Sequence, residues 1–114
     1  MRRYVHRTVA LFALVAALIA LPGLCAQAAE IGVVILHGKG GMPNGLVKPL
    51  AAYLEGQGFR VANLEMPWSK TRTYGAPPAD GVAEIDQAFA TMKSAGVDKH
   101  FLIGHSLGGI FAAY

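Results

Sequence analysis

The chain has 114 residues, of which 54% are hydrophobic and 15% are charged, so its composition allows one small globular domain. The formal net charge of +3 comes entirely from Arg2, Arg3 and Arg7, because the other seven basic residues balance the seven acidic ones. The rest of the chain therefore carries no net charge, and its sequence shows no basic patch that would predict a nucleic-acid partner.

Residues 1–28 have the pattern of a secretory signal peptide. The three arginines precede an uninterrupted apolar run from Val9 to Leu21, Pro22 breaks this run, and Ala26 and Ala28 occupy the small-residue positions before a cleavage site. Cleavage after Ala28 predicts an exported protein, periplasmic or secreted, with no lasting membrane span. The alternative is an uncleaved membrane anchor, although the apolar run is shorter than the roughly 20 residues that span a bilayer.

The only cysteine, Cys25, lies within this leader, so the mature part has no disulfide, thiolate nucleophile or cysteine-type metal site. No cluster of His, Asp and Glu has the spacing of metal ligands. The glycine-rich stretch that begins at Gly38 has neither the dinucleotide-binding spacing nor a G-K-[ST] motif. We therefore expect no metal and no cofactor.

Residues 29–114 form one predicted domain in which short apolar runs alternate with stretches of helical spacing. The predicted strands are Ile31–Leu36, Phe59–Leu64 and His100–Ile103. The predicted helices run from about Lys48 to Glu55, from a cap at Asp80 to a stop at Gly96, and from Leu107 to the last residue given. This alternation predicts an α/β fold: a mostly parallel sheet with helices on both faces, in which the first and third strands are neighbours.

Two segments between the second and third strands bear on the core and on a substrate pocket. Val82, Ile85, Phe89 and Met92 recur at helical spacing and predict the buried face of their helix. The long polar loop before that helix contains Trp68, which either lines a substrate pocket or packs over the core. The same two alternatives apply to Tyr74.

The sequence GHSLGG at residues 104–109 comes directly after the third strand and directly before a helix. The pattern G-x-S-x-G in this context is typical of a nucleophile elbow, because the glycines let the backbone turn sharply and the serine projects into a cleft. The N–H of Leu107 would be free to stabilise an oxyanion. A glycine-rich loop, HGKGG, follows the first strand at the sheet edge where ligands bind in open parallel sheets.

The pairing of these two loops resembles the α/β-hydrolase superfamily, and the resemblance covers the N-terminal portion of such a domain, about residues 31–114. It implies that Ser106 is the nucleophile and that the backbone N–H groups of Leu107 and Lys39 form the oxyanion hole, with Gly40 as a substitute for Lys39. It also implies a serine hydrolase that cleaves an ester, thioester or amide of a small-molecule or lipid-like acyl substrate. A binding or scaffold protein of the same fold without turnover is the alternative.

The rest of the catalytic triad is not expected within this sequence, because in this fold the chain order is serine, then acid, then histidine. We expect His37 to brace the oxyanion loop, His105 to point away from the serine hydroxyl, and His100 to lie at the opposite edge of the sheet. Glu65 is at best a remote candidate for the acid. The acid and the histidine are therefore expected beyond residue 114, and the fragment alone is expected to be inactive.

Overall fold

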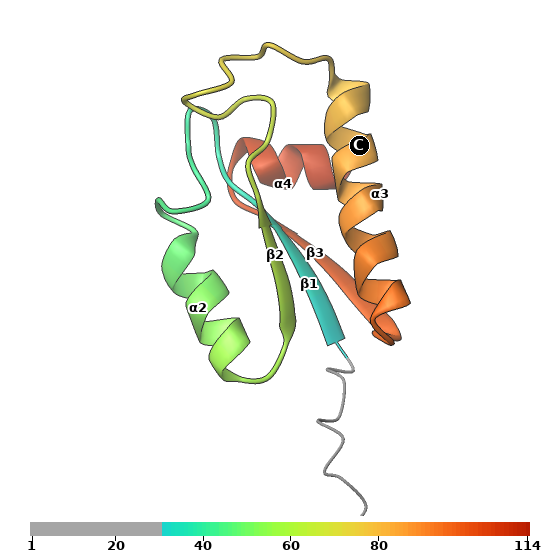
Figure 1. Ribbon diagram of the computed structural model, residues 1–114. Coiled ribbons are helices and arrows are strands. Elements are labelled where there is room, and N and C mark those ends of the chain that lie inside the picture. The colour runs from blue at the N-terminus through green and yellow to red at the C-terminus, as the bar shows by residue number, and fades with distance from the viewer. Residues whose placement is uncertain (1–30) are drawn as a thin grey trace, which may run out of the picture.

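The computed structural model describes residues 31–114, so the predicted signal peptide lies outside the described residues. Strands and helices alternate along the chain (Figure 1). The strands are β1 (Ile31–Leu36), β2 (Arg60–Leu64) and β3 (Lys99–Gly104). The helices are α2 (Lys48–Gly56), α3 (Pro78–Ser94) and α4 (Leu107–Ala112). Each element lies within two residues of its predicted bounds, except that α3 starts earlier than the predicted cap.

The three strands form one parallel sheet in the order β2-β1-β3, with β1 at the centre. This order confirms the prediction that the first and third strands are neighbours. Leu36, the last residue of β1, is aligned with Leu64 on one side and Gly104 on the other. All three carboxyl ends therefore meet at one edge of the sheet, and the loops that follow β1 and β2 meet there too (Figure 1).

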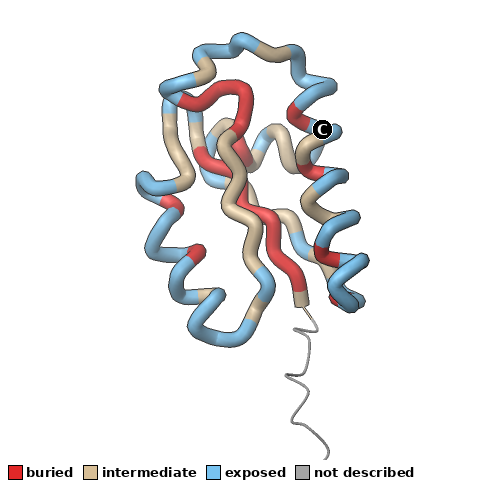
Figure 2. Tube along the Cα trace, viewed as in Figure 1, coloured by how far each residue is buried: buried red, intermediate tan, exposed pale blue. Residues whose placement is uncertain are grey.

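The central strand separates two apolar cores, because its successive side chains point to opposite faces of the sheet. Val33 and Ile35 pack on one face against Val47 and Ala51 at the start of α2. The other face of the sheet is covered by α3, α4 and the loop after β2. Its buried residues are Val34, Leu36, Met66, Trp68, Ile85, Met92 and Val97. Buried residues thus follow β1 along its length, with helices on both sides (Figure 2), and the α/β class is confirmed.

The predicted cap of α3 is wrong. The helix begins at Pro78, Pro77 is the N-cap residue, and Asp80 lies inside the first turn without a side-chain capping hydrogen bond. Proline suits the first turn because its φ is already near the helical value and its missing N–H would have had no partner there. The carboxylate of Asp80 still lies where the helix dipole favours a negative charge.

The predicted buried face of α3 is correct for Ile85 and Met92, and Phe89 is partly buried, but Val82 is wrong because it is 37% exposed. The first turn instead buries Gly81, where an added Cβ would lie 3.1 Å from the ring of Phe111. The close approach of α4 therefore selects a glycine at this point of the interface. Within residues 31–114, no helix is long and apolar enough to cross a membrane.

Candidate active site

Ser106 occupies the single turn between β3 and α4 at the carboxyl edge of the sheet. Its φ and ψ are 55° and −117°, a backbone conformation that residues with a side chain rarely adopt. Such strain costs on the order of 1–3 kcal/mol and persists only where the surroundings enforce it. The serine is solvent-exposed, so its hydroxyl is accessible to a substrate.

The close approach of backbone segments enforces this turn. A Cβ on Gly104 would collide with the backbone of Gly108, and a Cβ on Gly108 would lie 2.5 Å from the carbonyl oxygen of Leu36 and 2.8 Å from that of His37. The N–H of His105 donates to the Leu36 carbonyl at 2.9 Å, which extends the β1–β3 pairing into the turn. The two glycines of the motif thus let α4 start against the end of the central strand.

The glycine-rich loop after β1 lies directly beside the turn. A Cβ added at Gly38 would be 3.2 Å from the Cβ of Ser106 and 3.0 Å from Nδ1 of His105. Among residues 31–114, neither the N–H of Lys39 nor that of Leu107 has a hydrogen-bond acceptor. The structure therefore brings together the loops that carry the predicted nucleophile and both predicted oxyanion donors.

Gly40 does not serve as the substitute donor that the sequence suggested. Its N–H already donates to the carbonyl of Trp68 at 2.9 Å, and its φ of +63° is one that glycine adopts readily. This bond joins the loop after β1 to the loop after β2. The sequence gives no sign of it, because the two partners lie on different loops, 28 positions apart.

His37 braces the glycine-rich loop, in agreement with the prediction. Its side chain is 2% exposed, its Nδ1–H donates to the Gly38 carbonyl at 2.8 Å, and its Nε2 accepts from the N–H of Met66 at 3.0 Å. The indole N–H of Trp68 donates to the His37 carbonyl at 2.8 Å. Because both ring nitrogens are engaged within the protein, His37 is not available as a general base.

The two alternatives for Trp68 are now resolved in favour of packing. The side chain is 4% exposed, and its ring lies 4.7 Å from that of Phe111 and 6.1 Å from that of His37, measured between centroids. Tyr74, in contrast, is 57% exposed and has a positive φ of 62°. Trp68 thus holds the two loops and α4 together.

No general base is in place among the described residues. The hydroxyl of Ser106 has no hydrogen-bond partner within residues 31–114. His100 is aligned with Gly32 near the start of β1, at the end of the sheet away from Ser106, and packs on Phe89. His105 is exposed and lines a pocket of about 130 Å³ beside the glycine-rich loop. The described residues supply a candidate nucleophile and oxyanion hole without a base.

Glu65 is committed to its own loop. Its carboxylate accepts hydrogen bonds from the hydroxyls of Ser69, at 2.8 Å, and Thr71. These bonds, with a smaller contribution from the charge of Arg72, hold the pKa of Glu65 below its ordinary value. Arg72 in turn donates to the Glu65 carbonyl and forms a two-point ion pair with Glu84 at 2.7 and 2.8 Å. This network orders the loop and leaves no carboxylate directed at Ser106.

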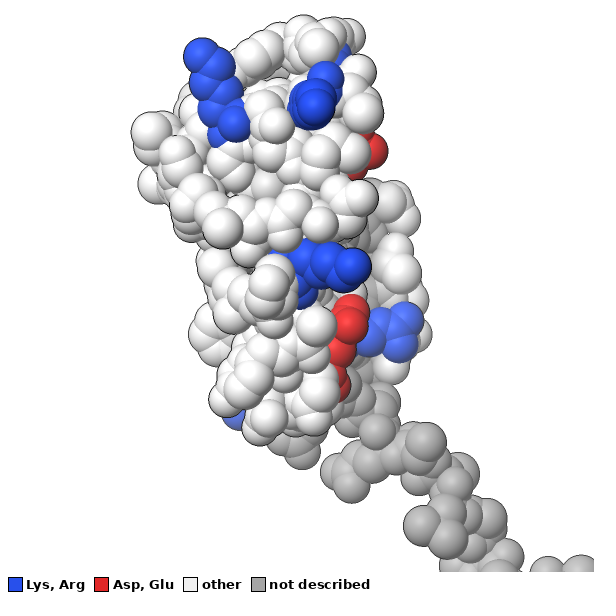
Figure 3. All heavy atoms as spheres, turned by 90° about the vertical axis from the view of Figure 1, so that its left-hand side faces the viewer, with Lys and Arg blue, Asp and Glu red and all other residues white. Residues whose placement is uncertain are grey.

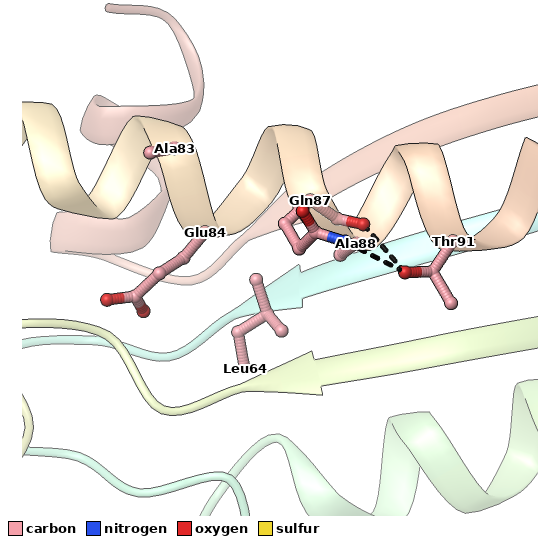
Figure 4. A pocket seen from close by; sticks show the side chains of 6 residues that line it. All are labelled: Leu64, Ala83, Glu84, Gln87, Ala88 and Thr91. Atoms are coloured by element: carbon pink, nitrogen blue, oxygen red, sulfur yellow. Dashed lines mark hydrogen bonds between the residues drawn. The ribbon is translucent and has the colours of Figure 1, made fainter.

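A cavity of about 440 Å³ lies away from Ser106, between the edge strand β2 and α3. Figure 4 shows Leu64 rising from β2 toward the helix, with Gln87 and Thr91 along it. The Thr91 hydroxyl donates to the Gln87 carbonyl at 2.9 Å, and Glu84 is held by Arg72. The polar side chains that line this cavity are thus bonded to neighbouring groups of the protein. The cavity is therefore an apolar groove rather than a reaction site.

No protein-family model matches the chain, and neither a curated protein nor a solved structure shows significant similarity to it.

Proposed function

We propose that this protein is an exported serine hydrolase of the α/β-hydrolase type, which cleaves an ester, thioester or amide through an acyl-enzyme on Ser106. The observation that carries the proposal is the strained turn of Ser106 at the carboxyl edge of the sheet, held against a glycine-rich loop. A serine in such a turn presents its hydroxyl to a cleft, and the strain is maintained by backbone contacts on both sides. Export depends on the leader, residues 1–28.

In the proposed reaction, Oγ of Ser106 attacks the substrate carbonyl carbon while its proton passes to a general base. The N–H groups of Lys39 and Leu107 stabilise the negative charge that develops on the carbonyl oxygen. Collapse of the tetrahedral intermediate breaks the bond to the leaving group, which takes the proton from the base. Water then cleaves the acyl-enzyme by the same steps. The base, and the acid that orients it, come from outside residues 31–114.

A fluorophosphonate probe tests the proposal, because it phosphonylates a serine only when that serine is activated. With the base present, we expect the protein to be labelled at Ser106, and we expect Ser106→Ala to lose the label. Ser94→Ala is the matched control, since Ser94 is an exposed serine at the end of α3, and it should remain labelled. Labelling that survives Ser106→Ala would contradict the assignment.

A binding or scaffold protein without turnover is the second candidate. It is favoured by one observation, that the Ser106 hydroxyl lacks a partner among residues 31–114. Absence of labelling in a protein with an intact far-ultraviolet circular dichroism spectrum would support this candidate over the hydrolase.

A further inference from the structure

Two lysines stand on the loops that surround the candidate site, Lys39 after β1 and Lys70 after β2. The two loops are joined by backbone hydrogen bonds, from the N–H of Gly40 to the carbonyl of Trp68 at 2.9 Å and from the N–H of Lys70 to the carbonyl of Gly41 at 3.2 Å. The lysines are therefore carried by adjacent, hydrogen-bonded backbone segments at the carboxyl edge of the sheet.

The charges of these lysines are not neutralised by the protein. In the part of the chain that the structure describes, the only ion pair joins Arg72 to Glu84. Glu65, the one acidic residue of the two loops, is bound by the hydroxyls of Ser69 and Thr71. Basic side chains stand out at the upper end of Figure 3, where the loops lie, and the acidic side chains visible on that face lie below them. Lys39 and Lys70 thus carry ammonium groups at the carboxyl edge that no ion pair within residues 31–114 engages.

One of the two lysines, Lys39, belongs to the loop that packs against Ser106. Lys39 follows Gly38, which packs against Ser106, and the same lysine lines the pocket of about 130 Å³. The remaining lining of this pocket is partly apolar, from Met42, Leu46 and Val47. At roughly 30 Å³ per water-sized group, the pocket has room for about four such groups. It is therefore suited to a short acyl chain with a charged end.

We infer that the site selects an acyl substrate whose short chain ends in a carboxylate, which the ammonium groups of Lys39 and Lys70 bind. This inference depends on the proposed hydrolase function and specifies its substrate class. A cluster of like charges beside a cleft raises the local concentration of an oppositely charged substrate and weakens as salt is added. The lysines then determine specificity, while the backbone N–H of Lys39 serves the reaction itself.

A pair of substrates that differ in charge but little in shape tests the inference: monomethyl succinate and methyl 4-methylpentanoate, in which an isopropyl group replaces the carboxylate. Hydrolysis is followed by titration of the released acid at constant pH. The measured quantity is the ratio of kcat/KM for the anionic ester to that for the neutral ester. An exposed ion pair contributes up to about 1 kcal/mol, which corresponds to roughly a fivefold effect.

We expect Lys39→Gln and Lys70→Gln each to lower this ratio about threefold to fivefold, through KM for the anionic ester, and we expect 0.5 M NaCl to lower it in the wild type. Lys93→Gln, at an exposed lysine in the last turn of α3, is the matched control and should leave the ratio unchanged. Equal kcat/KM ratios in the wild type and the three variants would overturn the inference. It would also be overturned if Lys93→Gln lowered the ratio as much as Lys39→Gln and Lys70→Gln do.

A second measurement does not require the protein to hydrolyse either methyl ester, so it also applies if the natural substrate is a thioester or an amide. Succinate should slow fluorophosphonate labelling of Ser106 in the wild type and do so less in Lys39→Gln. Labelling that succinate leaves unchanged in the wild type would overturn the inference while the hydrolase function stands. In a protein that carries the base as well as residues 31–114, absence of labelling and of hydrolysis of both esters would overturn the proposed function, and the inference with it.

Discussion

Backbone packing, rather than hydrogen bonding by its own side chain, fixes the conformation of Ser106. The serine is the N-cap residue of α4 but makes no side-chain capping bond. Its strain is balanced by the approach of α4 to the carbonyl groups of Leu36 and His37, which only a glycine at position 108 permits. The side chain of the serine is consequently free for chemistry while its backbone is held.

Gly108→Ala is expected to destabilise the protein. The new Cβ would meet backbone oxygens at 2.5 and 2.8 Å, and a backbone atom has no flexible end that can move away. Overpacking of this kind costs about 1–3 kcal/mol, and each kcal/mol lowers the melting temperature of a small domain by about 4–8 °C. Thermal unfolding followed by circular dichroism measures the change.

Gly56→Ala is the control for this substitution. An added Cβ at Gly56, the last residue of α2, has no atom within 4 Å, and alanine favours the helix. Its melting temperature should stay the same or rise. Equal melting temperatures for the two variants would show that α4 is not held against β1 as described.

At the scale of single residues, the sequence predicted those features that depend on neighbouring residues in the chain. The pattern G-x-S-x-G directly after a strand predicts a sharp turn at the serine, and the structure has Ser106 in such a turn. The engagement of the Gly40 N–H was not predictable, because its acceptor, Trp68, belongs to another loop. Hydrogen bonds between loops depend on the tertiary arrangement, which local patterns do not encode.

At the scale of elements, the loop between β2 and α3 is the segment whose order depends most on polar groups. Glu65 accepts bonds from Ser69 and Thr71, and the Arg72 guanidinium joins this end of the loop to Glu84 on α3. The bonds to Glu84 raise the pKa of the Arg72 guanidinium above its ordinary value. The loop thus positions Trp68 and Lys70 through a carboxylate-centred network.

Glu65→Gln should destabilise the protein at neutral pH and have little effect in acid. The pKa of Glu65 is lower in the folded protein than its ordinary value of about 4.5, so the carboxylate stabilises the fold above that pH. This contribution is lost as the pH falls through the lowered pKa of the folded state. Urea unfolding at pH 7 and at pH 3 should give a wild-type advantage at pH 7 that shrinks at pH 3.

Asp86→Asn controls for the loss of a negative charge, since Asp86 is exposed on α3. Its urea midpoint should differ little from that of the wild type at either pH. A Glu65→Gln effect that is equally large at pH 7 and pH 3 would mean that the glutamate acts through packing rather than through its charge.

The bounds of helices and strands were predictable to the extent that single-residue signals mark them. Strand β1 and the start of α2 match because β-branched runs and Pro49 are strong local signals. The start of α3 was misplaced because both a proline and an aspartate suit the first turn, and only tertiary packing decides between them. Val82 was misplaced for the same reason, since α4 contacts the turn at Gly81 instead.

At the scale of the whole molecule, the parallel sheet brings loops from distant parts of the chain together at one edge. The loops that follow Leu36, Leu64 and Gly104 all lie at one edge, and they carry the turn of Ser106, the glycine-rich loop and the two lysines. This convergence was predictable from strand-helix alternation, because right-handed crossovers leave few arrangements. The sequence also predicted that His37 and His100 do not serve as the base, and their positions in the structure agree with this.

Because no general base is in place among the described residues, we expect the 114-residue chain to have no esterase activity that depends on Ser106. A general base must come within about 3.2 Å of the proton that it removes, and the Ser106 hydroxyl has no such partner among residues 31–114. His37 is held by the Gly38 carbonyl and the Met66 N–H, and His100 lies at the other end of the sheet. Purified as residues 1–114, the chain should hydrolyse 4-nitrophenyl acetate no faster than its Ser106→Ala variant. Robust hydrolysis that is abolished by Ser106→Ala and also by His105→Ala would identify His105 as the base and contradict this arrangement.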